Sequence, residues 1–242
     1  MLLSACSSLT SLVFAALVGR RCLARRQPAE LVWTLGLLWY AISTGAQALG
    51  GWRGWDPLTY RWWYLAGAFY TAAYLGMGSI YLVAPRPVAH GIMAWLALGS
   101  LMVAPLVLLT PLDLSLLPAA GEAPTGRALH EAVRKATPLF NLFGAAALFC
   151  GALWGAAHFW RSGRSPRAIA NLLIAAGAVV PSFASGLTRF GLTATLALGQ
   201  LVGLWLILAG FLLALRSPRL GVARPDSGPA NSAQSADFEK VL

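Results

Sequence analysis

Histidine is the residue type in this chain best suited to bind a metal or a haem iron. His90 and His158 fall near the same predicted membrane boundary, at the ends of two apolar segments. Two imidazoles at one depth can ligate haem or a metal ion. No further ligands accompany them in the sequence, and a histidine at a membrane boundary is more often an interfacial residue. We therefore predict no cofactor and no metal, with haem bound by His90 and His158 as the alternative.

Other chemical motifs are not evident in the sequence. It has no Ser-His-Asp arrangement, no HExxH zinc motif and no glycine-rich phosphate loop. Its cysteines, Cys6, Cys22 and Cys150, lack CxxC spacing. The predicted spans contain no Asp or Glu, although intramembrane proton and sodium relays are built on carboxylates. The sequence thus predicts a protein that is not an enzyme.

Polar and aromatic side chains recur at helical spacing within the apolar segments. If the faces that carry them converge, they line an aromatic, weakly polar cavity that opens toward the outside. The alternative is that the same side chains make interhelical hydrogen bonds of about 0.6 kcal/mol each. The candidate cavity residues are Tyr40, Gln47, Tyr70, Tyr74, Asn171, Ser182 and Gln200.

Small residues repeat every four positions in the fifth apolar segment. Ala147, Gly151 and Gly155 share one helical face. A face of small residues allows two helices to approach closely. The sequence leaves open whether this face packs inside the bundle or forms the seam of a homodimer.

The amino-acid composition of the chain predicts the secondary-structure elements that must position these residues. Hydrophobic residues make up 58% of the 242 residues and charged residues 11%, against roughly 45–50% and about 25% in soluble domains. These values exclude a soluble globule, and they exclude disorder for most of the chain. The predicted fold is therefore an all-α, polytopic membrane helix bundle. Seven segments are long enough to span a bilayer: residues 2–18, 31–51, 62–83, 88–109, 138–159, 168–187 and 192–215.

The distribution of basic residues predicts the orientation of the bundle. Twelve of the 18 basic residues lie after the first, third, fifth and seventh segments, and six lie on the opposite side. Because cytoplasmic connections carry the excess of Lys and Arg, the N-terminus is predicted outside and the C-terminus in the cytoplasm. We expect a bacterial cytoplasmic (inner) membrane protein in contact with the lipid bilayer. The basic residues are too scattered to predict a nucleic-acid partner.

Two stretches fall outside the spans. The outer connection, about 110–137, is long, and its residues 128–136 predict a short amphipathic helix with Leu129 and Val133 on one face. The connection is either a lid over an outward-facing cavity or an interfacial segment. Residues 1–215 form the predicted transmembrane domain. Residues 216–242, rich in Pro, Ser, Ala, Asp and Arg, are predicted to be a disordered cytoplasmic tail.

Four stretches carry a resemblance to a known group of proteins. They are residues 25–36 (RRQPAELVWTLG), 54–67 (GWDPLTYRWWYLAG), 138–144 (PLFNLFG) and 171–177 (NLLIAAG). With them, most of residues 20–190 resembles a family of bacterial seven-span integral membrane proteins from high-GC organisms. That family has no established activity, so the resemblance implies the fold and no catalytic residues.

The absence of recognisable chemistry and the aromatic faces together predict the function. We expect a non-enzymatic module that binds a small apolar ligand, a lipid or a membrane-protein partner. The alternative is a carrier or channel for an uncharged or weakly polar solute. In that case the first three and last three spans would be parallel halves around the fourth, as in repeat-built transporters.

Overall fold

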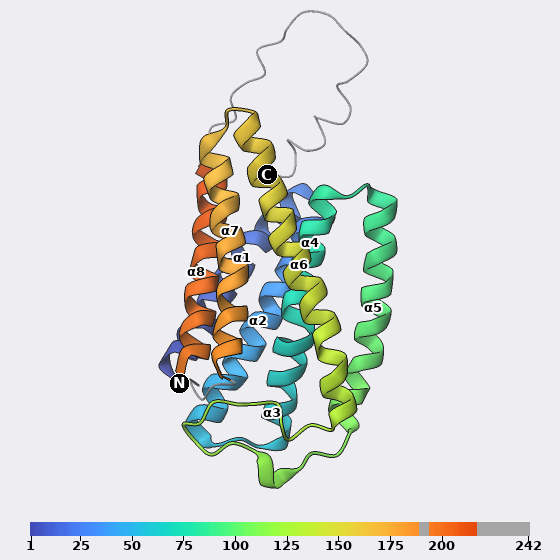
Figure 1. Ribbon diagram of the computed structural model, residues 1–242, viewed down its shortest axis with the longest axis vertical. Coiled ribbons are helices and arrows are strands. Elements are labelled where there is room, and N and C mark those ends of the chain that lie inside the picture. Colours follow the sequence, from blue (N-terminus) through green and yellow to red (C-terminus); the bar gives the residue numbers. More distant parts are fainter. Residues whose placement is uncertain (189–193, 217–242) are drawn as a thin grey trace, which may run out of the picture.

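The computed structural model describes residues 1–188 and 194–216 (Figure 1). These residues form helices and contain no β-strand, so the predicted all-helical fold is confirmed. The predicted tail, 216–242, lies outside the described residues except for Arg216, which ends the last helix. The elements are α1 (Leu2–Arg25), α2 (Pro28–Arg53), α3 (Pro57–Tyr64), η1 (Leu65–Thr71), α4 (Ala72–Val83), α5 (Arg86–Leu109), η2 (Leu114–Leu116), α6 (Glu131–Arg161), α7 (Ser165–Thr188) and α8 (Ala194–Arg216).

Six helical segments are long and apolar enough to cross a membrane. They are α1, the continuous α3–η1–α4 segment, α5, α6, α7 and α8. The remaining predicted span, α2, has 26 residues, so at 1.5 Å per residue its length of about 39 Å is sufficient. Its polar and aromatic residues Trp33, Tyr40 and Gln47 are buried against other helices.

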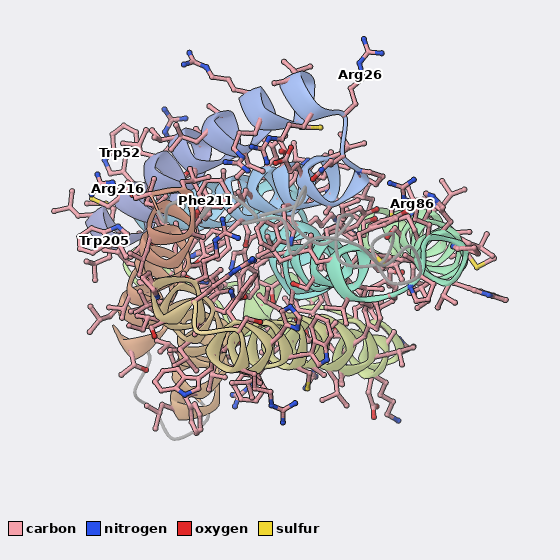
Figure 2. The ribbon with its side chains drawn as sticks, turned by 90° about the horizontal axis from the view of Figure 1, so that it is seen from above. Arg26, Trp52, Arg86, Trp205, Phe211 and Arg216 are labelled. Atoms are coloured by element: carbon pink, nitrogen blue, oxygen red, sulfur yellow. The ribbon has the colours of Figure 1, made fainter. Side chains whose placement is uncertain are left out.

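Six of the helices close into a ring. α1 packs on α2, α2 on α4, α4 on α6, α6 on α7, α7 on α8, and α8 returns to α1. α5 stands outside this ring beside α4 and η1, as the views along and across the bundle both show (Figures 1 and 2).

The two ends of the bundle differ in composition. At one end lie the short connections α1–α2, α4–α5 and α6–α7 and the end of α8 (Figure 1). We call it the Arg-rich end, because it carries Arg20, Arg21, Arg25, Arg26, Arg86, Arg161, Arg164, Arg167 and Arg216. Three of these, Arg26, Arg86 and Arg216, point outward from the periphery in Figure 2. The opposite end holds the N-terminus, α3 and the connection after α5 (Figure 1).

The centre of the ring is filled by apolar side chains from all six helices. Phe14 of α1, Leu37 of α2 and Leu204 of α8 are each 1% exposed, and they pack with Leu75 and Leu148. Because lipid is as apolar as these residues, van der Waals contact rather than the hydrophobic effect favours their association inside a bilayer.

Close backbone contacts and hydroxyl groups hold individual helix pairs. Gly76 of α4 faces Gly144 of α6, and a Cβ on either would overlap the other helix's backbone. α1 is joined to α2 by Ser8 Oγ and Ser11 Oγ, which donate to the carbonyl oxygens of Ala41 (2.9 Å) and Leu37 (2.7 Å). These hydroxyls explain how the serine-bearing face of the first segment packs against α2.

The predicted end of the outer connection is wrong. α6 begins at Glu131 and runs through Pro138, so residues 131–136 are its first turns, and no separate amphipathic helix forms. His130 caps this helix, since its Nδ1 accepts from the Ala132 N–H at 3.3 Å, and Val133 is fully buried. The connection therefore spans residues 110–130.

This connection is fastened to the bundle. Its Gly121 N–H donates to the Gly51 carbonyl at 3.0 Å, and its Ala128 N–H donates to the Tyr60 hydroxyl at 3.3 Å. Gly126 takes a left-handed φ of 73° and lies against the Tyr64 ring. The connection thus closes the second core cluster around α3 and η1.

A π-helical segment, η1, interrupts the third span, which the sequence did not predict. Such a segment inserts extra residues into an α-helix and leaves carbonyls without their usual partners. Two hydroxyls satisfy carbonyls there. Ser43 Oγ of α2 donates to the Trp63 carbonyl at 3.1 Å, and Thr71 Oγ1 donates to the Ala66 carbonyl at 2.8 Å.

Candidate functional site

The tyrosines predicted to line a cavity make hydrogen bonds between helices. The Tyr40 hydroxyl donates to the Gln200 carbonyl at 2.7 Å. The Tyr70 hydroxyl donates to the Ser100 carbonyl at 2.7 Å, and the Tyr74 hydroxyl lies 3.3 Å from Ser100 Oγ. Two separate contacts therefore form, one between α2 and α8 and one between the third span and α5.

The other predicted cavity residues are dispersed. Gln47 is buried, and neither its Oε1 nor that of Gln200 has a hydrogen-bond partner. Ser182 is exposed on α7. Asn171 is buried, donates to the Arg167 carbonyl at 3.0 Å, and lines a small cavity.

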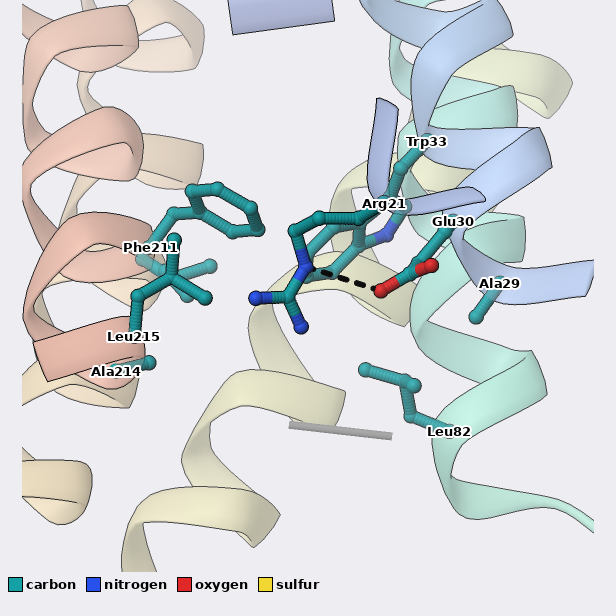
Figure 3. Close-up of a pocket in the computed structure, with 9 residues that line it drawn as sticks. Arg21, Ala29, Glu30, Trp33, Leu82, Phe211, Ala214 and Leu215 are labelled. Carbon is teal, nitrogen blue, oxygen red and sulfur yellow. Dashed lines mark hydrogen bonds and ion pairs between the residues drawn. The ribbon is translucent and has the colours of Figure 1, made fainter. Parts of the chain in front are cut away.

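Two adjoining cavities of about 20 Å³ each lie toward the Arg-rich end of the ring. We call the first the mouth pocket (Figure 3); it is lined by Arg21, Ala29, Glu30, Trp33, Leu82, Ile174, Phe211, Ala214 and Leu215. The second shares Trp33, Leu82 and Ile174 with it and adds Ser79, Val83, Gly151, Ala152 and Asn171. Asn171 is the one predicted cavity residue that lines either of them. Their location is opposite to the outward-facing cavity expected from the sequence.

An ion pair forms the polar wall of the mouth pocket. Arg21 Nε donates to Glu30 Oε1 at 3.1 Å, and the two side chains are 21% and 6% exposed. The Arg21 guanidinium also lies 5.5 Å from the centre of the Phe211 ring on α8. In Figure 3 it stands between α2, which carries Glu30 and Trp33, and α8, which carries Phe211 and Leu215.

The local sequence explains why these charges meet. α1 ends at Arg25, Arg26 adopts a left-handed φ of 52°, and Pro28 begins α2. This tight connection sets the end of α1 beside the start of α2. The polarity of each helix also favours the charges, since anions are stabilised near helix N-termini and cations near C-termini.

Part of each charged group has no protein partner. Glu30 Oε2 is buried without a hydrogen bond. Among the described residues, no acceptor lies within hydrogen-bonding distance of the two terminal nitrogens of Arg21. In Figure 3 one of these nitrogens points toward Leu215, and the other points down, between Leu215 and Leu82. The pair therefore leaves one edge of the guanidinium without a protein acceptor among the described residues.

Glu30 lies one residue before the predicted span 31–51 but within the helix that contains it. The predicted span began at residue 31, whereas α2 begins at Pro28 and buries Glu30 to 4% exposure in its first turn. Proline at the first position of a helix and an acidic residue in the first turn are common helix-start signals. That pattern could have placed Glu30 inside the helix. The structure therefore adds a buried carboxylate at the edge of a predicted span.

The two histidines have different neighbours. His90 Nδ1 lies 3.0 Å from the Tyr81 hydroxyl, and the His158 ring stacks on Trp154 at 5.6 Å. Over residues 1–188 and 194–216, no group of three or more His, Cys, Asp and Glu side chains could hold a metal ion.

The small-residue face lies against helices of the same chain. A Cβ on Gly151 would come 3.0 Å from Ser79 of α4, and one on Gly155 would come 2.7 Å from Asn171 of α7. Ala147 is half-buried on the same helix. Gly151 and Gly155 thus pack inside the bundle, which is one of the two arrangements that the sequence left open.

In comparisons with known proteins, no family model, curated protein or solved structure matches the chain. The chain's own residues are therefore what bears on its function.

Proposed function

We propose that this chain is a non-enzymatic membrane protein that binds an apolar ligand, specifically a membrane lipid, at the mouth pocket. In this proposal all seven helical segments, α2 included, span a bacterial inner membrane, with the N-terminus outside and the C-terminus in the cytoplasm. The arginines of the Arg-rich end support this orientation, because cytoplasmic connections carry the excess of basic residues. As part of this proposal, the chain is a relative of the bacterial seven-span membrane proteins that it resembles.

The observation that carries the proposal is the composition of the mouth pocket. Trp33, Leu82, Phe211 and Leu215 supply apolar walls, and the Arg21–Glu30 pair supplies one polar wall. Ligand sites combine mostly apolar walls with a few placed polar groups. Ionisable residues inside membrane segments are costly, and they mark functional sites more often than other residues do.

The size of the pocket indicates how a lipid would bind. A cavity of about 20 Å³ holds little more than one water molecule. An acyl chain would therefore lie along the open side of the pocket, beside the lining residues of α1, α2 and α8, and would not be enclosed.

The alternative is a carrier for an uncharged or weakly polar solute. It is favoured by two interruptions of the helices, the π-helical segment η1 and Pro181 inside α7. Interrupted helices form the substrate sites of many transporters. A carrier would have to open the apolar centre of the ring around Leu37 and Leu204. Solute flux into liposomes that contain the purified protein would favour this alternative.

The proposal is tested by native mass spectrometry of the protein released from a mild detergent. We expect a discrete added mass in the range of a phospholipid. Ala214 lines the pocket, so Ala214→Phe should fill it and remove the added mass, whereas Ala209→Phe, on the exposed face of the same helix, should keep it. No added mass, or equal retention by the two variants, would contradict binding at this pocket.

A further inference from the structure

We propose that the molecule bound at the mouth pocket carries a phosphate group and that Arg21 binds this phosphate. This inference rests on the proposed function and specifies the chemistry of the headgroup. The two terminal nitrogens of Arg21 have no acceptor among the described residues; one points toward Leu215 and the other between Leu215 and Leu82 (Figure 3). They are the strongest unused hydrogen-bond donors of the pocket. A guanidinium edge of this kind matches two phosphate oxygens at once.

Glu30 and Phe211 position the guanidinium for this contact. The bond from Arg21 Nε to Glu30 Oε1, at 3.1 Å, fixes the plane of the group. The Phe211 ring supports the guanidinium from α8 at 5.5 Å. Two helices therefore hold Arg21 before any ligand arrives, which lowers the entropy that binding would lose. Glu30 is a positioning residue in this arrangement and does not touch the phosphate.

The charge of the surroundings favours an anion. Within the described part of the chain, Glu30 is the acidic residue of the Arg-rich end, which also carries arginines of α1, α5, α6, α7 and α8. Basic pockets between membrane helices on the cytoplasmic side bind phosphorylated lipid headgroups. Leu82, Phe211 and Leu215, which line the same pocket, offer apolar contacts to an acyl chain. A glycerophospholipid meets both requirements, and free phosphate meets the first.

The headgroup is tested by adding defined probes to delipidated full-length protein in detergent and recording native mass spectra. The probes are phosphatidylglycerol, phosphatidylcholine and diacylglycerol with identical acyl chains, and inorganic phosphate. We expect both phospholipids to bind about tenfold more tightly than diacylglycerol, the size of a charge-assisted hydrogen bond. If millimolar inorganic phosphate alone displaces the bound molecule, the phosphate site stands, and its ligand is free phosphate. Equal binding of diacylglycerol would overturn the phosphate site and leave lipid binding standing. Failure of every probe would overturn both.

Variants test whether the preference for phospholipid over diacylglycerol depends on Arg21. Arg21→Gln should abolish the difference between phosphatidylglycerol and diacylglycerol. Arg20→Gln removes the same charge from an exposed neighbouring position and should keep the difference. Because Arg21→Gln leaves Glu30 buried without its partner, the Arg21→Gln/Glu30→Gln double variant provides a neutral pocket should the single variant not fold. A phosphate preference that survives in either folded Arg21 variant would refute the assignment.

Discussion

A close backbone contact between two helices, at the crossing of α4 and α6, is open to a direct test with Gly144→Ala. The Cβ of an alanine at this position would lie closer than 3.0 Å to backbone atoms of Ala72 and Ala73. Backbone atoms cannot rotate away as a side chain can, so one helix would have to move. The same holds from the other side, where a Cβ on Gly76 would overlap Gly144.

The expected change in the free energy of unfolding follows from two opposing effects. Forcing an extra methyl group into a packed contact costs about 1–3 kcal/mol. Replacing glycine by alanine within a helix returns roughly 0.5–1 kcal/mol. We therefore expect Gly144→Ala to lower the free energy of unfolding by about 1–2 kcal/mol. For a chain of this size, each kcal/mol corresponds to about 2–4 °C in melting temperature.

Thermal unfolding in detergent, followed by circular dichroism, measures this change. Gly91→Ala is the matched control, because a Cβ on Gly91 of α5 meets nothing within 4 Å. That variant should melt at the wild-type temperature or slightly above it. A Gly144→Ala protein that melts no lower than Gly91→Ala would refute the backbone contact between α4 and α6.

Two further predictions concern the aromatic end and the orientation. Asp56 caps α3, since its Oδ1 accepts from the N–H groups of Leu58 and Thr59 at 2.9 and 3.0 Å, and the hydrogen bonds from Thr59 hold the pKa of its carboxyl below the usual 3.8. This contribution is complete above the unfolded pKa and is lost as pH falls through the lower folded pKa, so Asp56→Ala should cost about 1 kcal/mol at pH 7 and little at pH near 2 in melting curves. A reporter enzyme fused after Leu242 should be active only in the cytoplasm, and activity outside the cell would overturn the proposed topology.

Hydropathy predicted the helical segments well and their ends poorly. The predicted spans stop next to Arg, Trp or Glu residues, but the backbone stays helical through these interfacial residues. α1 continues past residue 18 to Arg25, and α6 begins seven residues before the predicted 138. The largest consequence was at α2, where three additional residues at the start of the helix brought Glu30 inside.

Helical periodicity places side chains on a face but does not identify the helix that meets this face. Tyr70 and Tyr74 were expected beside Tyr40, yet both reach Ser100 of α5, a helix that supplied none of the predicted cavity residues. The π-helical segment η1 adds to the difference, because its extra residues rotate the face that follows Trp63. The mouth pocket likewise depends on α8 meeting α1, a contact between the two ends of the described chain.

Stability alone does not account for the ion pair of the mouth pocket. A buried ion pair can often be replaced by apolar residues without loss of stability, because its desolvation costs about as much as its attraction returns. This chain fills the same ring with apolar side chains such as Phe14 and Leu204 a few turns away. Hydroxyls elsewhere in the bundle, such as those of Ser11 and Tyr40, satisfy carbonyls of neighbouring helices. Arg21 instead uses one nitrogen to bond Glu30 and leaves two others without an acceptor among the described residues, which is the arrangement expected of a group held ready for a ligand.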